Sequence, residues 1–301
     1  MSWLDRTVSL LLPAVPRPIV GYFSRPYIAG STMEDAFRTV RDLATRGAMS
    51  TLDILGEFTS SSAEARRNTE AYEELIRRVA AERLAETHIS VKLTALGLLL
   101  DRDLCLEHMR RLVRLADECE NFVRIDMEDS SCTTETLRIY ETLREESPER
   151  VGTVLQSRLR RTLDDTDRLT RQPANLRLCK GIYLEPREIA YTDPELIRRN
   201  FVAALDLMFQ RRAYVGIATH DERLVWEALR LVRKHSLRPH QYEFQMLLGV
   251  DEPLRRILLD AGHRLRVYVP FGEQWYQYSV RRLRENPQIA GYALRAIFKR
   301  N

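Results

Sequence analysis

Short apolar runs alternate with helical patterns along the chain from Met49 onward. Each run is β-branched or otherwise apolar and ends in polar residues, and a stretch with the apolar spacing of an amphipathic helix follows it. The runs predict strands at 50–55, 88–93, 122–126, 152–156, 175–179, 214–219, 242–246 and 265–269. Helices are predicted between them at 63–85, 103–119, 134–145, 159–170, 194–212, 222–235 and 253–261.

Strands that alternate with helices in this way predict an α/β fold with a parallel sheet, and eight such units close into a (βα)8 barrel of the TIM type. An open, doubly wound sheet is the alternative, but no G-x-G-x-x-G follows any predicted strand. The 301 residues suit one barrel of about 250 residues with an extension. We predict an N-terminal arm at 1–48, helical from Thr32 to Arg46, and a barrel domain at 49–301 whose last helix lies over the barrel mouth.

Composition points to a soluble globular protein without a nucleic-acid partner. Apolar residues make up 44% of the chain and charged residues 30%, and the net charge is only +4. No block of five or more like charges forms a binding tail. The run at 8–15 is too short for a membrane span of about 18 residues and is interrupted by prolines, so we favour a packing or docking helix over a signal peptide.

The four cysteines and six histidines predict neither disulfides nor a metal site. The cysteines form no C-x-x-C pair, and the histidines form no H-x-x-x-H pattern. Sparse, unpaired cysteines are typical of a reducing compartment, which predicts a cytoplasmic location.

Alternation along the predicted strands indicates which side chains point into the barrel. In 88–93 the apolar residues alternate with Ser90 and Lys92, and in 122–126 they alternate with Arg124 and Asp126. A barrel interior is normally filled by Val, Ile and Leu, so charges of both signs near the strand ends favour a functional cavity. A buried structural salt-bridge network is the alternative. The same alternation places further polar residues inside: Asp53, Gln156, Arg177, Glu243, Gln245, Arg266 and Tyr268.

The segment 273–286, EQWYQYSVRRLREN, reads as the last helix. At helical spacing Tyr278, Arg281, Arg282 and Glu285 fall within about 60° of a common direction. Arginine presents a planar fork that suits a carboxylate, and Glu285 is placed to hold the guanidinium groups. We predict a clamp for a small anionic substrate, whereas a merely solvated helix face is the alternative. The opposite side, expected to pack on the protein, carries Tyr276, Val280 and Leu283.

Seven motifs in order make the chain resemble proline dehydrogenase in its short, single-function bacterial form. They cover almost the whole barrel, whereas 1–48 carries little of the resemblance. Departures at Ser157, Arg158, Cys179 and Ile182 concern the shape of the flavin pocket rather than its charged groups. The motifs are SVKLTALG at 90–97, RIDMED at 124–129, VLQ at 154–156, RLCKGIY at 177–183, ATHD at 218–221, EFQMLLG at 243–249 and RVYVPFGEQWYQYSVRRLREN at 266–286.

The resemblance implies FAD bound at the carboxyl ends of the strands without a Rossmann domain. Arg177 resembles the residue beside the reactive flavin nitrogen, where its charge would stabilise reduced flavin. Gln156 resembles a hydrogen-bond partner of the ring, and Gly181 permits close backbone approach. The full set of cofactor contacts implied is Met127, Gln156, Arg177, Lys180, Gly181, Ile182, Tyr183, Thr219, His220 and Gln245.

The resemblance also implies oxidation of L-proline to 1-pyrroline-5-carboxylate by hydride transfer, with Asp126, Arg177 and Tyr268 as the catalytic residues. Asp126 would orient Lys92 or the substrate amine. Electrons would then pass to a membrane quinone, which requires peripheral contact with the inner face of the membrane. Since the sequence ends at Asn301, no second dehydrogenase domain is expected to consume the product. The implied substrate contacts are Lys92, Leu247, Tyr268, Tyr278, Arg281, Arg282 and Glu285.

The residues leave two other classes of protein function open. Lys92 at a strand end is compatible with a Schiff-base aldolase, although that reading gives Arg177 and the paired arginines no role. A binding or scaffold barrel without catalysis is the second alternative.

Overall fold

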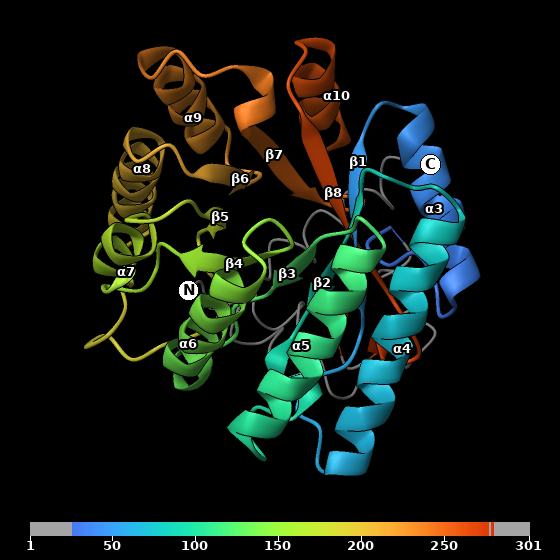
Figure 1. Ribbon diagram of the computed structural model, residues 1–301. Helices are drawn as coiled ribbons and strands as arrows, with labels where there is room; N and C mark the ends of the chain where they lie inside the picture. Colours follow the sequence, from blue (N-terminus) through green and yellow to red (C-terminus); the bar gives the residue numbers. More distant parts are fainter. Residues whose placement is uncertain (1–25, 277, 280–301) are drawn as a thin grey trace, which may run out of the picture.

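The computed structural model describes residues 26–276, 278 and 279. Eight parallel strands form a closed barrel in sequential order, with helices around it (Figure 1). The predicted (βα)8 barrel is confirmed, and the open-sheet alternative is excluded. The strands are β1 (Met49–Ile54), β2 (Thr87–Val91), β3 (Val123–Ile125), β4 (Val151–Gln156), β5 (Asn175–Cys179), β6 (Tyr214–Ala218), β7 (Tyr242–Leu247) and β8 (Leu265–Phe271).

The helices follow the strands as the sequence pattern predicts. Their apolar faces pack on the outward side chains of the strands: for example, Phe201 and Leu205 are buried in the same core as Leu176 and Val215. They are α3 (Met33–Thr45), α4 (Ser62–Ala81), α5 (Arg102–Glu118), α6 (Ser130–Glu146), α7 (Thr162–Leu169), α8 (Pro194–Gln210), α9 (Glu222–Lys234) and α10 (Glu252–Asp260), with 3-10 turns η2 (Leu93–Leu96) and η3 (Pro239–Gln241).

Most of the helices that follow strands begin with a capping side chain. In each of these the cap oxygen accepts a hydrogen bond from a backbone N–H in the first turn. Because these helices start at the carboxyl ends of the strands, the caps determine where each connecting loop stops at the barrel mouth. The capping residues are Ser61, Asp101, Asp129, Asp193, Asp221 and Asp251.

Helix α3 belongs to the outer layer of the barrel. It begins with a capping box between Thr32 and Asp35 and packs against β8 and β1 (Figure 1). Phe37 and Val40 lie in the same hydrophobic core as the barrel strands. The helix predicted from Thr32 to Arg46 is confirmed, whereas a boundary at residue 48 stays a prediction and the run at 8–15 lies outside the described residues.

Several boundaries differ from the predicted ones, and two of these differences have a clear local cause. Strand β2 ends at Val91 and the chain turns into η2 at Leu93, so Lys92 sits between strand and turn. Helix α4 ends at Ala81 rather than 85, because Arg83 adopts a left-handed φ of 55° and the Leu84 N–H bonds back to the Val79 carbonyl.

The last helix is described only in its first turn, and Val280 and Leu283, which were expected to pack on the protein, lie outside the described residues. Tyr278 and Ser279 are buried, whereas Tyr276 is half-buried. Tyr278 packs with Ile28 and Leu55, so the Tyr278 side chain faces the protein. Among the described helices none is long and apolar enough to cross a membrane.

Gly249 provides a test of how the segment near residue 26 packs. It has a φ of +71°, and a Cβ there would lie 2.0 Å from the Pro26 carbonyl oxygen, whereas Gly262 has a φ of +80° with nothing within 4 Å. We expect Gly262→Ala to cost about 1–2 kcal/mol for the left-handed backbone, and Gly249→Ala to cost more, because Pro26 must also move. Urea unfolding of both variants checks this, and equal losses would contradict the Pro26 contact.

Candidate active site

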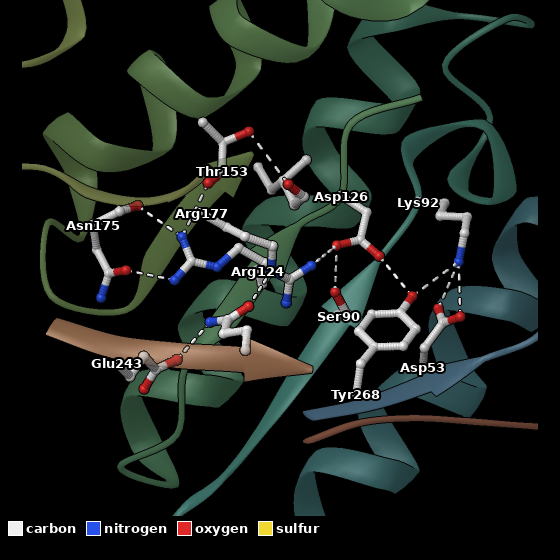
Figure 2. Close-up of polar contacts among 12 residues, drawn as sticks. Asp53, Ser90, Lys92, Arg124, Asp126, Thr153, Asn175, Arg177, Glu243 and Tyr268 are labelled. Atoms are coloured by element: carbon white, nitrogen blue, oxygen red, sulfur yellow. Dashed lines mark hydrogen bonds and ion pairs between the residues drawn. The ribbon is translucent and has the colours of Figure 1, made fainter. Parts of the chain in front are cut away.

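A buried carboxylate lies where three strands bring polar side chains together at the carboxyl end of the barrel (Figure 2). Asp126, just after β3, accepts hydrogen bonds from Ser90 Oγ at 2.6 Å, Arg177 Nη1 at 2.6 Å and the Tyr268 hydroxyl at 2.8 Å. Burial would raise the pKa of Asp126, but the charges of Arg177 and Lys92 and its hydrogen bonds lower it below the ordinary value. Asp126 is therefore held as a carboxylate.

Lys92 pairs with Asp53, so of the two roles expected for Asp126, orienting Lys92 or the substrate amine, the first is not seen as a direct contact. The Lys92 Nζ lies 2.8 Å from each Asp53 carboxylate oxygen and 3.5 Å from the Tyr268 hydroxyl. Asp53 lies on β1, opposite Ser90 of the adjacent β2, and this register brings its carboxylate beside the end of β2 that carries Lys92.

Lys92 remains protonated in this setting. Burial would lower the pKa of Lys92, but the charges of Asp53, Asp126 and Glu57 outweigh it and raise the pKa above its ordinary value. A Schiff-base nucleophile must be a neutral amine, so the paired Lys92 does not favour the aldolase alternative.

Arg177 is held from two sides inside the barrel. Its Nη1 binds Asp126, its Nε donates to Gln245 Oε1 at 2.5 Å, and the guanidinium carbon lies 5.4 Å from the centre of the Tyr268 ring. The third nitrogen, Nη2, makes no hydrogen bond to any residue in the described part of the chain. A charged donor therefore remains at the site.

A lower polar layer closes the barrel beneath this site. Arg266 Nε lies 2.8 Å from Glu243 Oε1, and Arg266 Nη1 donates to the backbone carbonyls of Ser50 and Glu86. Arg124 donates to the carbonyls of Thr153 and Asn175. These groups bind one another and the backbone, so the alternative of a structural salt-bridge network describes this lower layer. The upper layer, at the barrel mouth, consists of Lys92, Asp126, Arg177 and Tyr268 with their partners.

The predicted flavin contacts all lie at the carboxyl ends of strands or in the loops that follow. Gln156 Nε2 donates to the Glu128 carbonyl at 2.8 Å. Gly181 has a φ of +92°, and a Cβ there would lie 2.9 Å from Gln156 Oε1, so glycine is required for the packing of Gln156. Lys180 pairs with Asp221 at 3.1 Å.

The remaining predicted contacts lie around the same edge. His220 Nε2 accepts a hydrogen bond from the Leu247 N–H at 2.9 Å, which ties the end of β6 to the end of β7. The Thr219 hydroxyl accepts from the Asp221 N–H at 3.0 Å, and Met127 is buried. Ile182 and Tyr183 are half-buried in the loop after β5.

The predicted clamp is only partly within the described residues. Arg281, Arg282 and Glu285 lie outside them. Tyr278 lies close enough to Tyr268 to add to the rise in the pKa of the Tyr268 hydroxyl, which comes first from burial and then from Asp126 and Asp53. The start of the last helix is thus beside the upper layer.

Two carboxylates near the site had no predicted role. Glu57 Oε1 lies 3.9 Å from Lys92 Nζ. Glu128 accepts from the Thr94 N–H at 3.2 Å and from Thr94 Oγ1 at 2.5 Å, and burial raises its pKa to about 7. Strand alternation could not identify either residue, because β1 and β3 end before them; the RIDMED motif was the only signal for Glu128.

A closed barrel with paired acidic and basic groups at the carboxyl ends of its strands defines a (βα)8-barrel enzyme. The model of the family described as proline dehydrogenase matches residues 36–293. The chain therefore belongs to the proline dehydrogenase family, and the resemblance predicted from its motifs is confirmed. Membership makes it an oxidoreductase of proline metabolism, which argues against the scaffold alternative.

Similar proteins extend over most of the chain. Proline dehydrogenase 1 of Bacillus subtilis (strain 168) is 36% identical over 277 residues, which cover 92% of this chain and 91% of the relative. Proline dehydrogenase of Deinococcus radiodurans is 36% identical over 279 residues, with 91% and 89% covered. The crystal structure of proline utilization A from Bdellovibrio bacteriovorus superposes with a TM-score of 0.84 at 26% identity; it covers 91% of this chain, which spans 33% of that longer protein.

Glu128 predicts a pH dependence of stability. Its folded pKa of about 7 exceeds the ordinary 4.5, so the folded state binds the proton more tightly. Stability from this group is present below pH 4.5 and is lost as the pH rises toward 7, by about 3 kcal/mol at most. Glu128→Gln mimics the protonated form, and we expect it to be more stable than wild type near pH 8 but not near pH 5.

Urea unfolding at both pH values measures this difference. Glu188→Gln, at an exposed position, is the matched control and should leave the pH dependence unchanged. A wild type whose stability relative to Glu128→Gln is the same at both pH values would rule out the raised pKa.

Proposed function

We propose that the chain catalyses FAD-dependent oxidation of L-proline to 1-pyrroline-5-carboxylate and passes the electrons to a membrane quinone. The observation that best supports this proposal is the upper layer of the barrel. A protonated Lys92 and a cationic Arg177 lie on either side of Tyr268 at the mouth of a barrel of this family. The relatives named proline dehydrogenase support the same substrate.

The donor set fits a flavin. Arg177 keeps one nitrogen without a partner among the described residues, and a fixed cation at that point suits a ring that gains negative charge. Lys180 and Arg198 converge on Asp221 at the edge of the site, where cations suit phosphate groups. FAD, when bound, supplies the acceptor for the hydride. It would be held by Arg177, Gln156, Gln245, Lys180, Gly181, Ile182, Tyr183, Thr219, His220 and Met127.

Substrate binding follows from the charges. Lys92, kept protonated by Asp53, attracts the carboxylate of proline, together with Arg281 and Arg282. Tyr268 is fixed by its hydrogen bond to Asp126 and offers its ring to the apolar part of the substrate, as Leu247 would from the end of β7 and Tyr278 from the last helix. The lowered pKa of Asp126 makes it a poor general base, so the substrate amine binds neutral rather than losing its proton to this carboxylate.

The location and acceptor belong to the same proposal. A cytoplasmic protein that reduces a membrane quinone must contact the inner face of the membrane at least transiently. The apolar run at 8–15, beside basic and aromatic residues such as Arg17 and Phe23, supports a peripheral contact.

Loading with FAD tests the function directly. We expect the purified protein to take up FAD, and the yellow colour to bleach when L-proline is added without oxygen. Absorbance spectra before and after the addition measure both steps. Failure to take up FAD, or a bound flavin that proline does not reduce, would overturn the proposal.

The clamp makes a separate prediction about inhibitors. Arg282→Met removes a charge-assisted contact worth about 1.5–3 kcal/mol, which lowers kcat/KM for proline about tenfold to hundredfold. A five-membered ring acid without the amine should compete with proline, and its affinity should be lower for the variant than for wild type. Pyrrolidine, which has no carboxylate, should bind weakly to wild type and to the variant. Inhibition constants for the ring acid and for pyrrolidine test whether the arginines bind a carboxylate. If wild type binds the two compounds equally well, there is no clamp and the arginines belong to an ordinary solvated helix face.

A further inference from the structure

A continuous line of hydrogen bonds joins the upper layer to the lower one. Arg177 Nε donates to Gln245 Oε1 at 2.5 Å, and Gln245 Nε2 donates to Glu243 Oε1 at 2.5 Å. Glu243 is held in turn by Arg266, with contacts of 2.8 and 3.1 Å, and by the Tyr214 hydroxyl at 2.8 Å. Glu243 has an exposed fraction of 1% and does not reach the mouth of the barrel, so among the described residues its one hydrogen-bonded link to the site is Gln245.

The chemistry of the two ends gives Gln245 one orientation. A guanidinium only donates hydrogen bonds and a carboxylate only accepts them, so the amide oxygen must face Arg177 and the amide nitrogen must face Glu243. If Glu243 were absent, the amide would lose one of the two partners that select this orientation, together with the bond that anchors its nitrogen.

Glu243 keeps its charge in this position. Burial would raise the pKa of Glu243, but Arg266 outweighs it through its charge and its hydrogen bonds, so the pKa lies well below the ordinary value. A fixed carboxylate polarises the amide and strengthens its oxygen as an acceptor for Arg177.

A glycine makes room for the line. Gly216 of β6 lies opposite Arg177 in the sheet register, and a Cβ at Gly216 would lie 2.4 Å from Gln245 Nε2 and 2.8 Å from Gln245 Cδ. The Gln245 side chain therefore occupies the space that a side chain at 216 would take. Strand β6 is built so that Gln245 crosses to Arg177.

We propose that Glu243 is a positioning residue that holds the Arg177 guanidinium in place through the Gln245 amide and thereby sets the redox potential of the flavin. The inference rests on the proposed FAD-dependent function. A plain barrel-filling role for Glu243 and Arg266 is the contrary view, and it predicts no effect on the flavin.

The double variant Glu243→Leu/Arg266→Met separates the two views. It removes one negative and one positive charge, so the net charge below the flavin is unchanged and direct electrostatic effects largely cancel. Buried ion pairs replaced by apolar residues often leave a protein folded. With Arg177 less firmly held, we expect about a tenfold shift toward oxidised flavin, which is ~30 mV for a two-electron couple. We also expect kcat to fall with little change in KM for proline.

A double-mutant cycle tests whether the effect passes through Arg177. In the Arg177→Met background the same double change should no longer shift the potential. Gly216→Ala is the second variant, since it displaces the Gln245 amide without removing any polar group, and it should shift the potential in the same direction. Ser50→Ala/Thr87→Val is the matched control: it removes another buried polar pair, between β1 and β2 and 3.1 Å apart, that has no bond to Gln245, and the potential should stay constant.

A measurement on the protein without flavin tests the positioning of Arg177 by Glu243 independently of the proposed FAD-dependent function. In protein labelled with nitrogen-15 arginine, the Arg177 Nε–H signal, identified by its loss in Arg177→Met, should exchange slowly with water in wild type and faster in the double variant. An unchanged potential in folded double variant and in Gly216→Ala, or a shift that persists without Arg177, would overturn the proposal. If no FAD binds at all, the proposed function fails, and unchanged Nε–H exchange would then refute the positioning as well.

Discussion

The ion pair between Asp126 and Arg177 is the interaction on which the arrangement of the barrel mouth depends. Asp126 follows β3, Arg177 lies on β5, and the same carboxylate orients Ser90 from β2 and Tyr268 from β8. A buried carboxylate is stable only with such partners, and removing one of them leaves an uncompensated charge. The pair therefore constrains four strands at once and leaves the cation of Arg177 at the point where the proposed chemistry needs it.

The charged groups inside the barrel occur as three ion pairs, and this pairing allows a stable barrel to carry charges that serve function. Asp53 neutralises Lys92, Asp126 neutralises Arg177, and Glu243 neutralises Arg266. Of the pairs near the mouth, that of Arg177 keeps a donor without a partner among the described residues, whereas the lowest pair is saturated by backbone carbonyls and by Tyr214. The lower pair supports the upper groups through Gln245, which bonds to both Glu243 and Arg177.

The family match identifies the class of enzyme, whereas the geometry explains what the individual residues do. The match over residues 36–293 and the relatives at 36% identity assign the chain to the proline dehydrogenase family. The hydrogen bonds explain why its residues suit that chemistry: Lys92 is held protonated, Asp126 is held ionised, and Arg177 is aimed by Gln245. The same bonds give Glu243, which is far from the mouth, a role that a motif comparison does not assign.

The sequence by itself determined the eight strands, the inward direction of the polar residues and the family, because periodicity and motifs are local properties of a chain. Inward placement of Lys92, Asp126, Arg177 and Glu243 was predicted correctly on that basis. Only the tertiary structure decided that Lys92 pairs with Asp53 and that Tyr278 packs on Ile28 and Leu55. Alternation gives the direction of a side chain but not its partner across the barrel, which depends on the stagger of strands when the sheet closes.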